Sequence, residues 1–305
     1  MSIERLNRKQ ANSMPTLLPA ELRERLLNPY PRLRLSTISL VALLLAMLVW
    51  GVNGTDARLG ELVEGVPNII DFITRLFPPQ LELDPTTVVI PTALQSIVGR
   101  AEWTFPMPVI LFAIVETVQM AIIGTVAAVF LAAPFGLLAA RNTSPHPLVY
   151  QTTRLLLNMN RAVPDIIFAL IFVAAVGLGP FGGVLALAIG SIGFMGKLYA
   201  EAIEAIDPQQ VIAVRATGAS RLQSFLYAVM PQALPLIASY SLYLFELNIR
   251  AASILGLVGA GGVGFIISKY MSLFQYRRLM GAMILIVITV TLIDRASDYL
   301  RKKLI

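Results

Sequence analysis

The chain has no cysteine and a single histidine, His146, among its 305 residues. The absence of cysteine excludes disulfides, thiol chemistry and cysteine metal sites, and one histidine is too few for a histidine-based metal centre. The ATP-binding pattern G-x-x-x-x-G-K-[ST] is absent as well, so the chain does not hydrolyse ATP through a P-loop.

Charged residues are also scarce. They make up 14% of the chain, against about a quarter in soluble globular proteins, whereas 56% of the residues are hydrophobic and the mean hydropathy is +0.73. This composition is typical of a polytopic membrane protein, and a chain of this length has room for about six spans with loops. The net charge of +6 comes mostly from ends expected in the cytoplasm, so it orients the chain rather than binding nucleic acid.

Apolar runs separated by polar or glycine-rich segments predict an all-α fold with six membrane-spanning helices. The expected spans are 37–52, 114–138, 162–178, 184–198, 225–245 and 279–293. We expect an interfacial segment to lead into the second span. Between the second and third spans, 141–161 contains prolines and arginines and is predicted to be a cytoplasmic loop.

The same pattern divides the chain into five segments. They are a basic cytoplasmic segment (1–36), a first anchor (37–52), an external loop poor in Lys and Arg (53–105), a core (106–300) with a polar loop at 201–222, and a tail (301–305). Basic residues flank the last span on both sides, and their majority favours a cytoplasmic C-terminus. Both termini are therefore expected in the cytoplasm.

A polar stretch, Glu201–Pro235, separates two of the apolar runs. Asp207 and Pro208 are typical of a helix start, with Asp as the cap and Pro in the first turn, and Gly218 is typical of a helix end. Apolar residues are interleaved with the charges, so the stretch predicts a short amphipathic helix, a turn and a second helix. This shape suits docking into a groove on a soluble partner; the alternative is an ordinary amphipathic loop.

Four ionisable residues fall inside the apolar runs: Glu116, Asp165, Glu246 and Arg250. Charges at bilayer depth are costly and usually face a partner or a polar path. Glu246 and Arg250 are four residues apart, so on a helix they share a face and can pair. Arg250 belongs either to the external mouth of an anion pathway or to a structural ion pair. Asp165 follows a proline and is typical of a helix start, and the role of Glu116 is left open.

The stretch Phe245–Met271 is apolar enough to span but contains five glycines, from Gly256 to Gly264. So many glycines disfavour a continuous helix, and irregular backbone at membrane depth survives only inside protein or beside a water-filled path. We therefore predict a re-entrant or externally capping segment that serves as a gate. Helix packing without any gate is the alternative.

The residues around Gly218 resemble the cytoplasmic coupling loop of binding-protein-dependent ABC importer permeases. In that family the loop begins Glu-Ala-Ala, and here these places hold Ile212, Ala213 and Val214, so the family's glutamate is missing. Pro231 follows the loop, as in the family. The runs RAVPDIIFAL, RATGASRLQSF and ELNIRAASILGLVGAGGVG are similar to the permeases of phosphonate importers.

This resemblance implies a type I importer permease in a bacterial inner membrane, working by alternating access. It implies a second copy of the permease, two ATPase subunits that carry ATP and Mg, and a soluble substrate-binding protein, with no catalytic, metal or cofactor site on this chain. The implied substrate is phosphonate or a related phosphorus oxyanion, such as phosphite or phosphate.

The candidate site residues form two groups. Those expected to couple to the ATPase are Glu201, Glu204, Asp207, Ala213, Arg215, Gly218 and Arg221. Those expected to line a substrate pathway or gate are Glu246, Asn248, Arg250, Ser253, Gly259, Gly261 and Gly262.

Three other functions remain open at this point. An importer for another small solute, such as an amino acid, shares the coupling loop. A stand-alone secondary transporter or channel would show an internal repeat or paired broken helices, and only one glycine-rich break occurs here. A membrane-embedded enzyme would need a cluster of His, Asp or Glu at helical spacing, which the spans do not offer.

Overall fold

The computed structural model describes residues 35–55, 59–81, 85–86 and 107–304. Nearly all of the predicted segment 1–36 and about half of the predicted loop 53–105 therefore lie outside the described residues. The chain divides into two compact units, with the boundary between Ile69 and Ile70. We describe each unit by itself.

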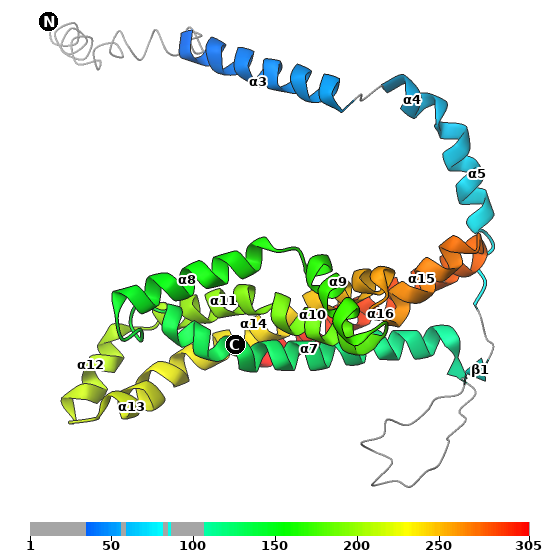
Figure 1. The fold of residues 1–305 in the computed structure, drawn as a ribbon. Helices are drawn as coiled ribbons and strands as arrows, with labels where there is room; N and C mark the ends of the chain where they lie inside the picture. The colour runs from blue at the N-terminus through cyan, green and yellow to red at the C-terminus, as the bar shows by residue number, and fades with distance from the viewer. Residues whose placement is uncertain (1–34, 56–58, 82–84, 87–106, 305) are drawn as a thin grey trace, which may run out of the picture. The chain divides into compact units, whose positions relative to one another are not determined.

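The described part of the first unit is helical (Figure 1). Helix α3 (Leu35–Gly54) contains the expected anchor and is long and apolar enough to cross a membrane. Helix α4 (Leu59–Glu64) follows it, and the unit boundary falls within α5 (Val66–Leu76). The external loop predicted after the anchor thus contains two helices in its described part.

The second unit is a bundle of helices with one short pairing of strands, β1 (Pro85–Thr86) with β2 (Met107–Pro108). In chain order its further elements are α7 (Val109–Ala139), α8 (Pro147–Ala162), α9 (Asp165–Val176), α10 (Pro180–Gly190), α11 (Ile192–Glu204), α12 (Pro208–Ala216), α13 (Arg221–Ser224), the π turn η1 (Phe225–Val229), α14 (Met230–Leu255), the 3-10 turn η2 (Gly256–Val258), α15 (Gly262–Ser272) and α16 (Tyr276–Leu304). The predicted all-α fold class is confirmed.

Helix α7 is the centre of this bundle and contacts α8, α10, α11, α14, α15 and α16. Small residues along it let its neighbours approach closely. A Cβ on Gly124 would lie 2.7 Å from the Leu187 Cβ of α10, and one on Gly136 would lie 2.6 Å from the Tyr199 Cβ of α11. The helix begins at Val109, five residues before the predicted span, and an interfacial position of its first turn stays a prediction.

The segment 141–161, predicted to be a cytoplasmic loop, is largely helix α8, so its prolines do not break the chain as expected, and its cytoplasmic placement stays a prediction. His146 caps α8 by accepting a hydrogen bond from the Leu148 N–H at 3.1 Å, and Pro147 occupies the first turn, where proline starts a helix rather than breaking it. Val163 is extended, as a residue before proline tends to be, and α8 and α9 meet there at 82°.

Five helices or helix runs of the described residues are long and apolar enough to span a membrane. The bent pair α8 and α9 makes a sixth if it is counted as one span. The predicted number of six is reached only on that count. Asp165 begins α9, as expected from its position after a proline.

Helix α14 is longer than the predicted span 225–245 and runs to Leu255. It is preceded by the π turn η1, in which the Met230 N–H bonds to the Phe225 carbonyl. Pro231 directly follows and has no N–H to donate to the ladder, which is a common cause of such local widening.

The glycine-rich segment does not fold back, so the re-entrant alternative is wrong, whereas the externally capping alternative stays a prediction. Asn248, before the turn, bonds to Thr125 of α7, and Val263, after it, bonds to Thr117. The later residue, Val263, thus bonds to a position on α7 that is nearer the N-terminus of α7 than the position bonded by Asn248. The chain therefore keeps its direction along α7 through η2 into α15. The glycines give a tight turn between two helices rather than a reversal.

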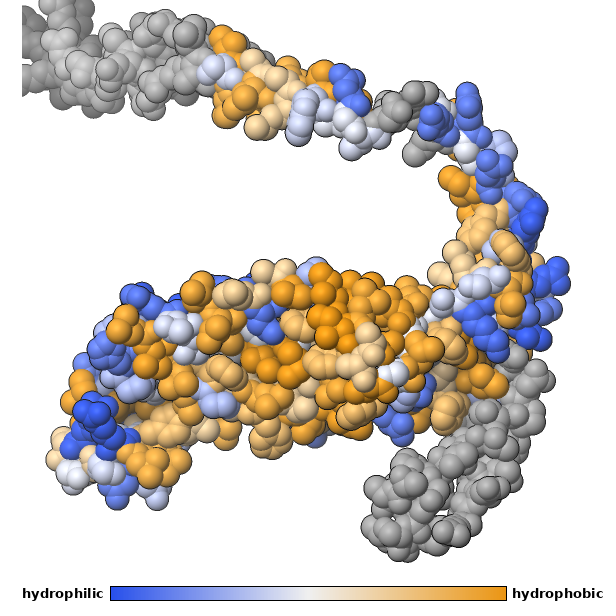
Figure 2. Space-filling model, in the orientation of Figure 1, coloured by the Kyte–Doolittle hydropathy of each residue, from blue (hydrophilic) through white to orange (hydrophobic). Residues whose placement is uncertain are grey.

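The surface drawn in Figure 2 is mostly apolar over the bundle, and hydrophilic residues gather at the end formed by α12 and α13. We call this the α12 end. Large apolar side chains are exposed on several spans, including Ile123, Phe130 and Val287. A surface of this kind suits a lipid or protein environment rather than water.

Candidate functional site

The α12 end is a helical hairpin built by local capping. The Asp207 side chain accepts from the Gln209 N–H at 2.9 Å, and Gly218 turns the chain with φ +86°. Ser220 and Gln223 then form a capping box, in which each side chain accepts from the other residue's backbone N–H. The short helix and turn predicted from the sequence are therefore present.

Helix α12 buries no residue of its own. Ala213 is exposed, and Ile212 is 60% exposed, although it is apolar. Only its Val211 side packs against the bundle, near η1, so the exposed apolar side chains of α12, such as Ile212, are available to a partner.

Beside α12 lies a cavity of about 700 Å³. Arg215 and Arg221 line it, together with polar residues of the loop between α7 and α8, such as Thr143 and Ser144. Both arginines are exposed, and neither has a carboxylate partner within the described residues. The two guanidinium groups are thus available to acidic or polar groups of another molecule.

Glu204, at the end of α11, is held by contacts within the chain. Its carboxylate accepts two hydrogen bonds of 3.0 Å from the Arg154 guanidinium of α8 and one of 2.8 Å from the Arg141 N–H. Arg141 and Arg154 also lie over the ring of Tyr150. The Tyr150 hydroxyl accepts from Arg141 and raises the pKa of that guanidinium. Glu204 therefore ties α8, α11 and the loop after α7 together.

Glu201, one turn earlier on α11, is exposed and makes no contact of this kind in the described part of the chain. The two glutamates that the sequence places together in the coupling group thus differ in their surroundings. Glu204 is engaged by partners within the chain, whereas Glu201 faces outward.

A charged ladder joins α14 to α16. The Arg250 guanidinium lies 2.7 Å from the Asp294 carboxylate, and Glu246, which is 8% exposed, is paired with Arg301. Asp298 adds a longer contact of 3.7 Å to Arg301. The direct pair between Glu246 and Arg250, left open by their spacing, is not formed, because each finds a closer partner on α16.

Asn248 lies inside the bundle rather than on a pathway surface. Its side-chain amide donates to the Thr125 hydroxyl at 2.9 Å, and its carbonyl oxygen accepts from Ser191 at 3.2 Å. Ser253 donates to the Ile249 carbonyl of its own helix at 3.0 Å. Both side chains are satisfied by the protein, as buried polar groups usually are.

The glycine turn is fastened to α7 by Glu116, whose role the sequence left open. Its carboxylate accepts from the Gly262 N–H at 2.7 Å, and the Thr117 hydroxyl accepts from the Val263 N–H at 2.8 Å. A carboxylate at a helix N-terminus satisfies an otherwise unpaired donor and complements the helix dipole.

Glycine is required in this turn by its backbone conformation and by its close packing. Gly259, Gly261 and Gly262 have φ values of +89°, +80° and +67°, which disfavour other residues. The Gly259 carbonyl accepts from the Gly179 N–H at 2.9 Å, which links the turn to the start of α10.

Residues 132–304 match the protein family described as "Binding-protein-dependent transport system inner membrane component". The match covers α8 to α16, including the α12 hairpin, the charged ladder and the glycine turn. The chain belongs to this family. It is a membrane-embedded permease with several apolar helices.

Two curated relatives resemble the permease closely. It is 38% identical over 288 residues to the phosphite transport system permease protein PtxC of Stutzerimonas stutzeri, covering 93% of this chain and 96% of that protein. It is 48% identical over 121 residues to the putative cryptic phosphonate transport system permease protein PhnE2 of Escherichia coli strain K12, covering 40% of this chain and 99% of that protein.

The fold also resembles a solved structure. The permease aligns with a chain of the inward-facing MetNI methionine ABC transporter with a TM-score of 0.57 and 22% identity, covering 64% of this chain and 96% of that chain. The likeness shows a shared fold, that of the type I importer permeases.

The charged candidate residues of the permease, Glu204, Glu246 and Arg250, form ion pairs with residues that are distant in the sequence. The sequence analysis missed Arg154, Asp294 and Arg301. Asp294 carried a usable signal, since it directly follows the last predicted span, 279–293, and a carboxylate at the end of an apolar run needs a partner as Arg250 does. Arg154 gave no such signal, because it lies in the segment 141–161, which was predicted to be a loop.

Proposed function

We propose that this permease is the membrane-spanning subunit of an ATP-driven importer for phosphonate or a related phosphorus oxyanion, such as phosphite or phosphate. The observation that carries the substrate class is the similarity to the phosphite permease PtxC, which extends over nearly the full length of both chains. The mechanism is alternating access, in which the pathway opens first to one side of the membrane and then to the other.

The proposed assembly contains two copies of the permease, two ATPase subunits that bind ATP and Mg, and a soluble binding protein. It lies in a bacterial inner membrane with both termini of the permease in the cytoplasm. The α12 hairpin docks on the ATPase. Support for this role comes from α12, which has no buried residue, and from Arg215 of α12 and Arg221 of α13, which have no carboxylate partner among the described residues.

Arg250 is the candidate pathway residue of this proposal. Its side chain is 52% exposed although it lies within a span, and that of its partner Asp294 is 33% exposed. Exposed charges at bilayer depth face a water-filled path or another protein surface rather than lipid. The glycine turn packs against α7 and α10, and its role as the gate of the substrate pathway remains a prediction.

The substrate class can be tested with the permease reconstituted in lipid with its ATPase and binding protein. We expect 2-aminoethylphosphonate, phosphite or phosphate to stimulate ATP hydrolysis severalfold, because substrate-loaded binding protein favours the ATP-closed state. An amino acid such as methionine is the control ligand. Stimulation by methionine but by none of the three oxyanions would contradict the substrate class while leaving the importer function in place.

The docking role of the α12 hairpin can be tested at Gly218. No atom lies within 4 Å of a Cβ placed there, so a substitution strains only the backbone, whose φ is +86°. We expect Gly218→Val to lower the substrate transported per ATP severalfold, because a β-branched residue shifts the turn. Gly218→Asn is the matched control, since asparagine tolerates this conformation. Normal coupling in the valine variant would refute the docking role.

A further inference from the structure

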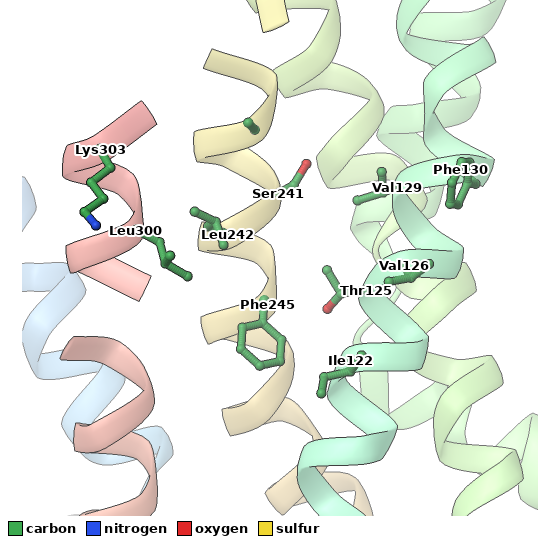
Figure 3. A pocket seen from close by; sticks show the side chains of 11 residues that line it. Ile122, Thr125, Val126, Val129, Phe130, Ser241, Leu242, Phe245, Leu300 and Lys303 are labelled. Carbon is green, nitrogen blue, oxygen red and sulfur yellow. The ribbon is translucent and has the colours of Figure 1, made fainter. Parts of the chain in front are cut away.

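A groove of about 680 Å³ lies between α7 and α14, with the end of α16 at its side (Figure 3). Its size is within the range of ligand pockets, roughly 300–1,000 Å³. All three elements belong to candidate membrane spans, and the span formed by α16 ends at Lys303, which lines the groove. The groove therefore lies between candidate membrane spans, and Lys303 stands at the end of one of them.

The groove walls are almost entirely hydrocarbon. Branched and aromatic side chains such as Ile122, Phe130, Phe245 and Leu300 form them. Phe130 is 75% exposed and Leu300 is 50% exposed, so a substantial apolar area lacks a cover within the chain.

The two hydroxyl groups along the groove are already engaged by the protein. Thr125 accepts from Asn248 at 2.9 Å, and Ser241 donates to the Ile237 carbonyl at 2.8 Å and is hydrogen-bonded to Tyr199 at 2.7 Å. The groove thus offers almost no polar group to a dissolved oxyanion. It is distinct from the pathway region at Arg250 and Asp294.

One cation lines the groove, at the end of the α16 span. The Lys303 ammonium lies 4.5 Å from the centre of the Tyr299 ring and has no carboxylate partner in the described parts of the chain. The neighbouring Arg301 differs, because Glu246 and Asp298 take up its charge. An apolar groove lined by one cation that has no carboxylate partner among the described residues complements an anionic amphiphile.

We propose that this groove binds an anionic phospholipid, with an acyl chain between α7 and α14 and the phosphate at Lys303. Interfaces between membrane helices favour small residues that let backbones approach, whereas seven of the eleven residues that line the groove are branched or aromatic apolar residues, and only Ala238, Ser241 and Thr125 are small. The inference is independent of which solute the permease transports.

Native mass spectrometry of the purified full chain tests the proposal, using phosphatidylglycerol and phosphatidylcholine with identical acyl chains. We expect one retained phosphatidylglycerol per chain and a preference over phosphatidylcholine of about fivefold, which corresponds to about 1 kcal/mol for one lysine at an anionic surface. Lys303→Gln should abolish the preference. Lys302→Gln is the matched control and should keep it, because Lys302 does not line the groove.

A second variant tests the groove itself. Ala238→Phe fills it from α14 and should reduce retention of both lipids severalfold. Equal loss of preference in Lys302→Gln and Lys303→Gln would overturn the proposal in favour of general charge attraction. Dissociation of permease dimers by Ala238→Phe, with lipid retention unchanged, would show instead that a second copy covers the groove.

Discussion

Replacing Gly264 by alanine is expected to destabilise the permease by about 3 kcal/mol or more, the upper range for overpacking a core. A Cβ at this position would lie 2.0 Å from the Ser253 carbonyl oxygen and 2.9 Å from the Gly256 Cα. Both are backbone atoms of the preceding helix and turn, so neither moves aside as a flexible side chain would. The close approach of α15 to the end of α14 is therefore possible only with glycine here.

The measurement is the melting temperature of the purified variant in detergent, followed by size-exclusion chromatography after heating. Gly51→Ala in α3 is the matched control, because no atom lies within 4 Å of a Cβ there and alanine favours a helix. An equal melting temperature for the two variants would show that the glycine packing does not hold α15 in place.

The second large effect is expected at Glu204. Glu204→Ala should destabilise the α12 end by about 2 kcal/mol, because it removes the acceptor of charge-assisted hydrogen bonds from Arg154 and of the Arg141 N–H. Arg154 and Glu204 are 32% and 27% exposed at their side chains, so solvent screening keeps the loss well below that of a buried pair. We also expect less substrate transported per ATP, since the loop after α7 lines the cavity beside α12.

A double-mutant cycle separates this pair from its surroundings. If the ion pair contributes, the free-energy cost of Glu204→Ala and Arg154→Ala combined should be smaller than the sum of the two single costs, by a coupling energy on the order of 1 kcal/mol. Glu201→Ala is the control on the same helix, because its side chain is exposed and makes no such contact in the described structure. Additive effects of the two substitutions would refute a direct contribution of the pair.

The sequence by itself determined the class of the protein and the local shape of its α12 end. Few charges and long apolar runs require helices in a membrane, because unpaired backbone groups are not tolerated in lipid. Asp207, Pro208 and Gly218 determined the α12 hairpin, since capping and turn preferences act between residues only a few positions apart. For the same reason the start of α9 at Asp165 was predictable.

Only the tertiary structure decided which charges meet. Helical spacing allowed Glu246 to pair with Arg250, but the packing of α16 against α14 brought Arg301 and Asp294 closer. Likewise, Glu204 was expected to face a partner protein, and the fold places Arg154 of α8 against it. Charge pairing depends on distances between helices that are far apart in the chain, and no local pattern contains those distances.

The direction of the chain through the glycine turn was decided in the same way. Five glycines predict an interruption of the helix, but they are compatible with either a reversal of the chain or a short turn. The hydrogen bonds from Glu116 and Thr117 of α7 to Gly262 and Val263 hold α15 along α7. They join residues 146 positions apart, so only the packed bundle determines that α15 continues along α7 instead of turning back.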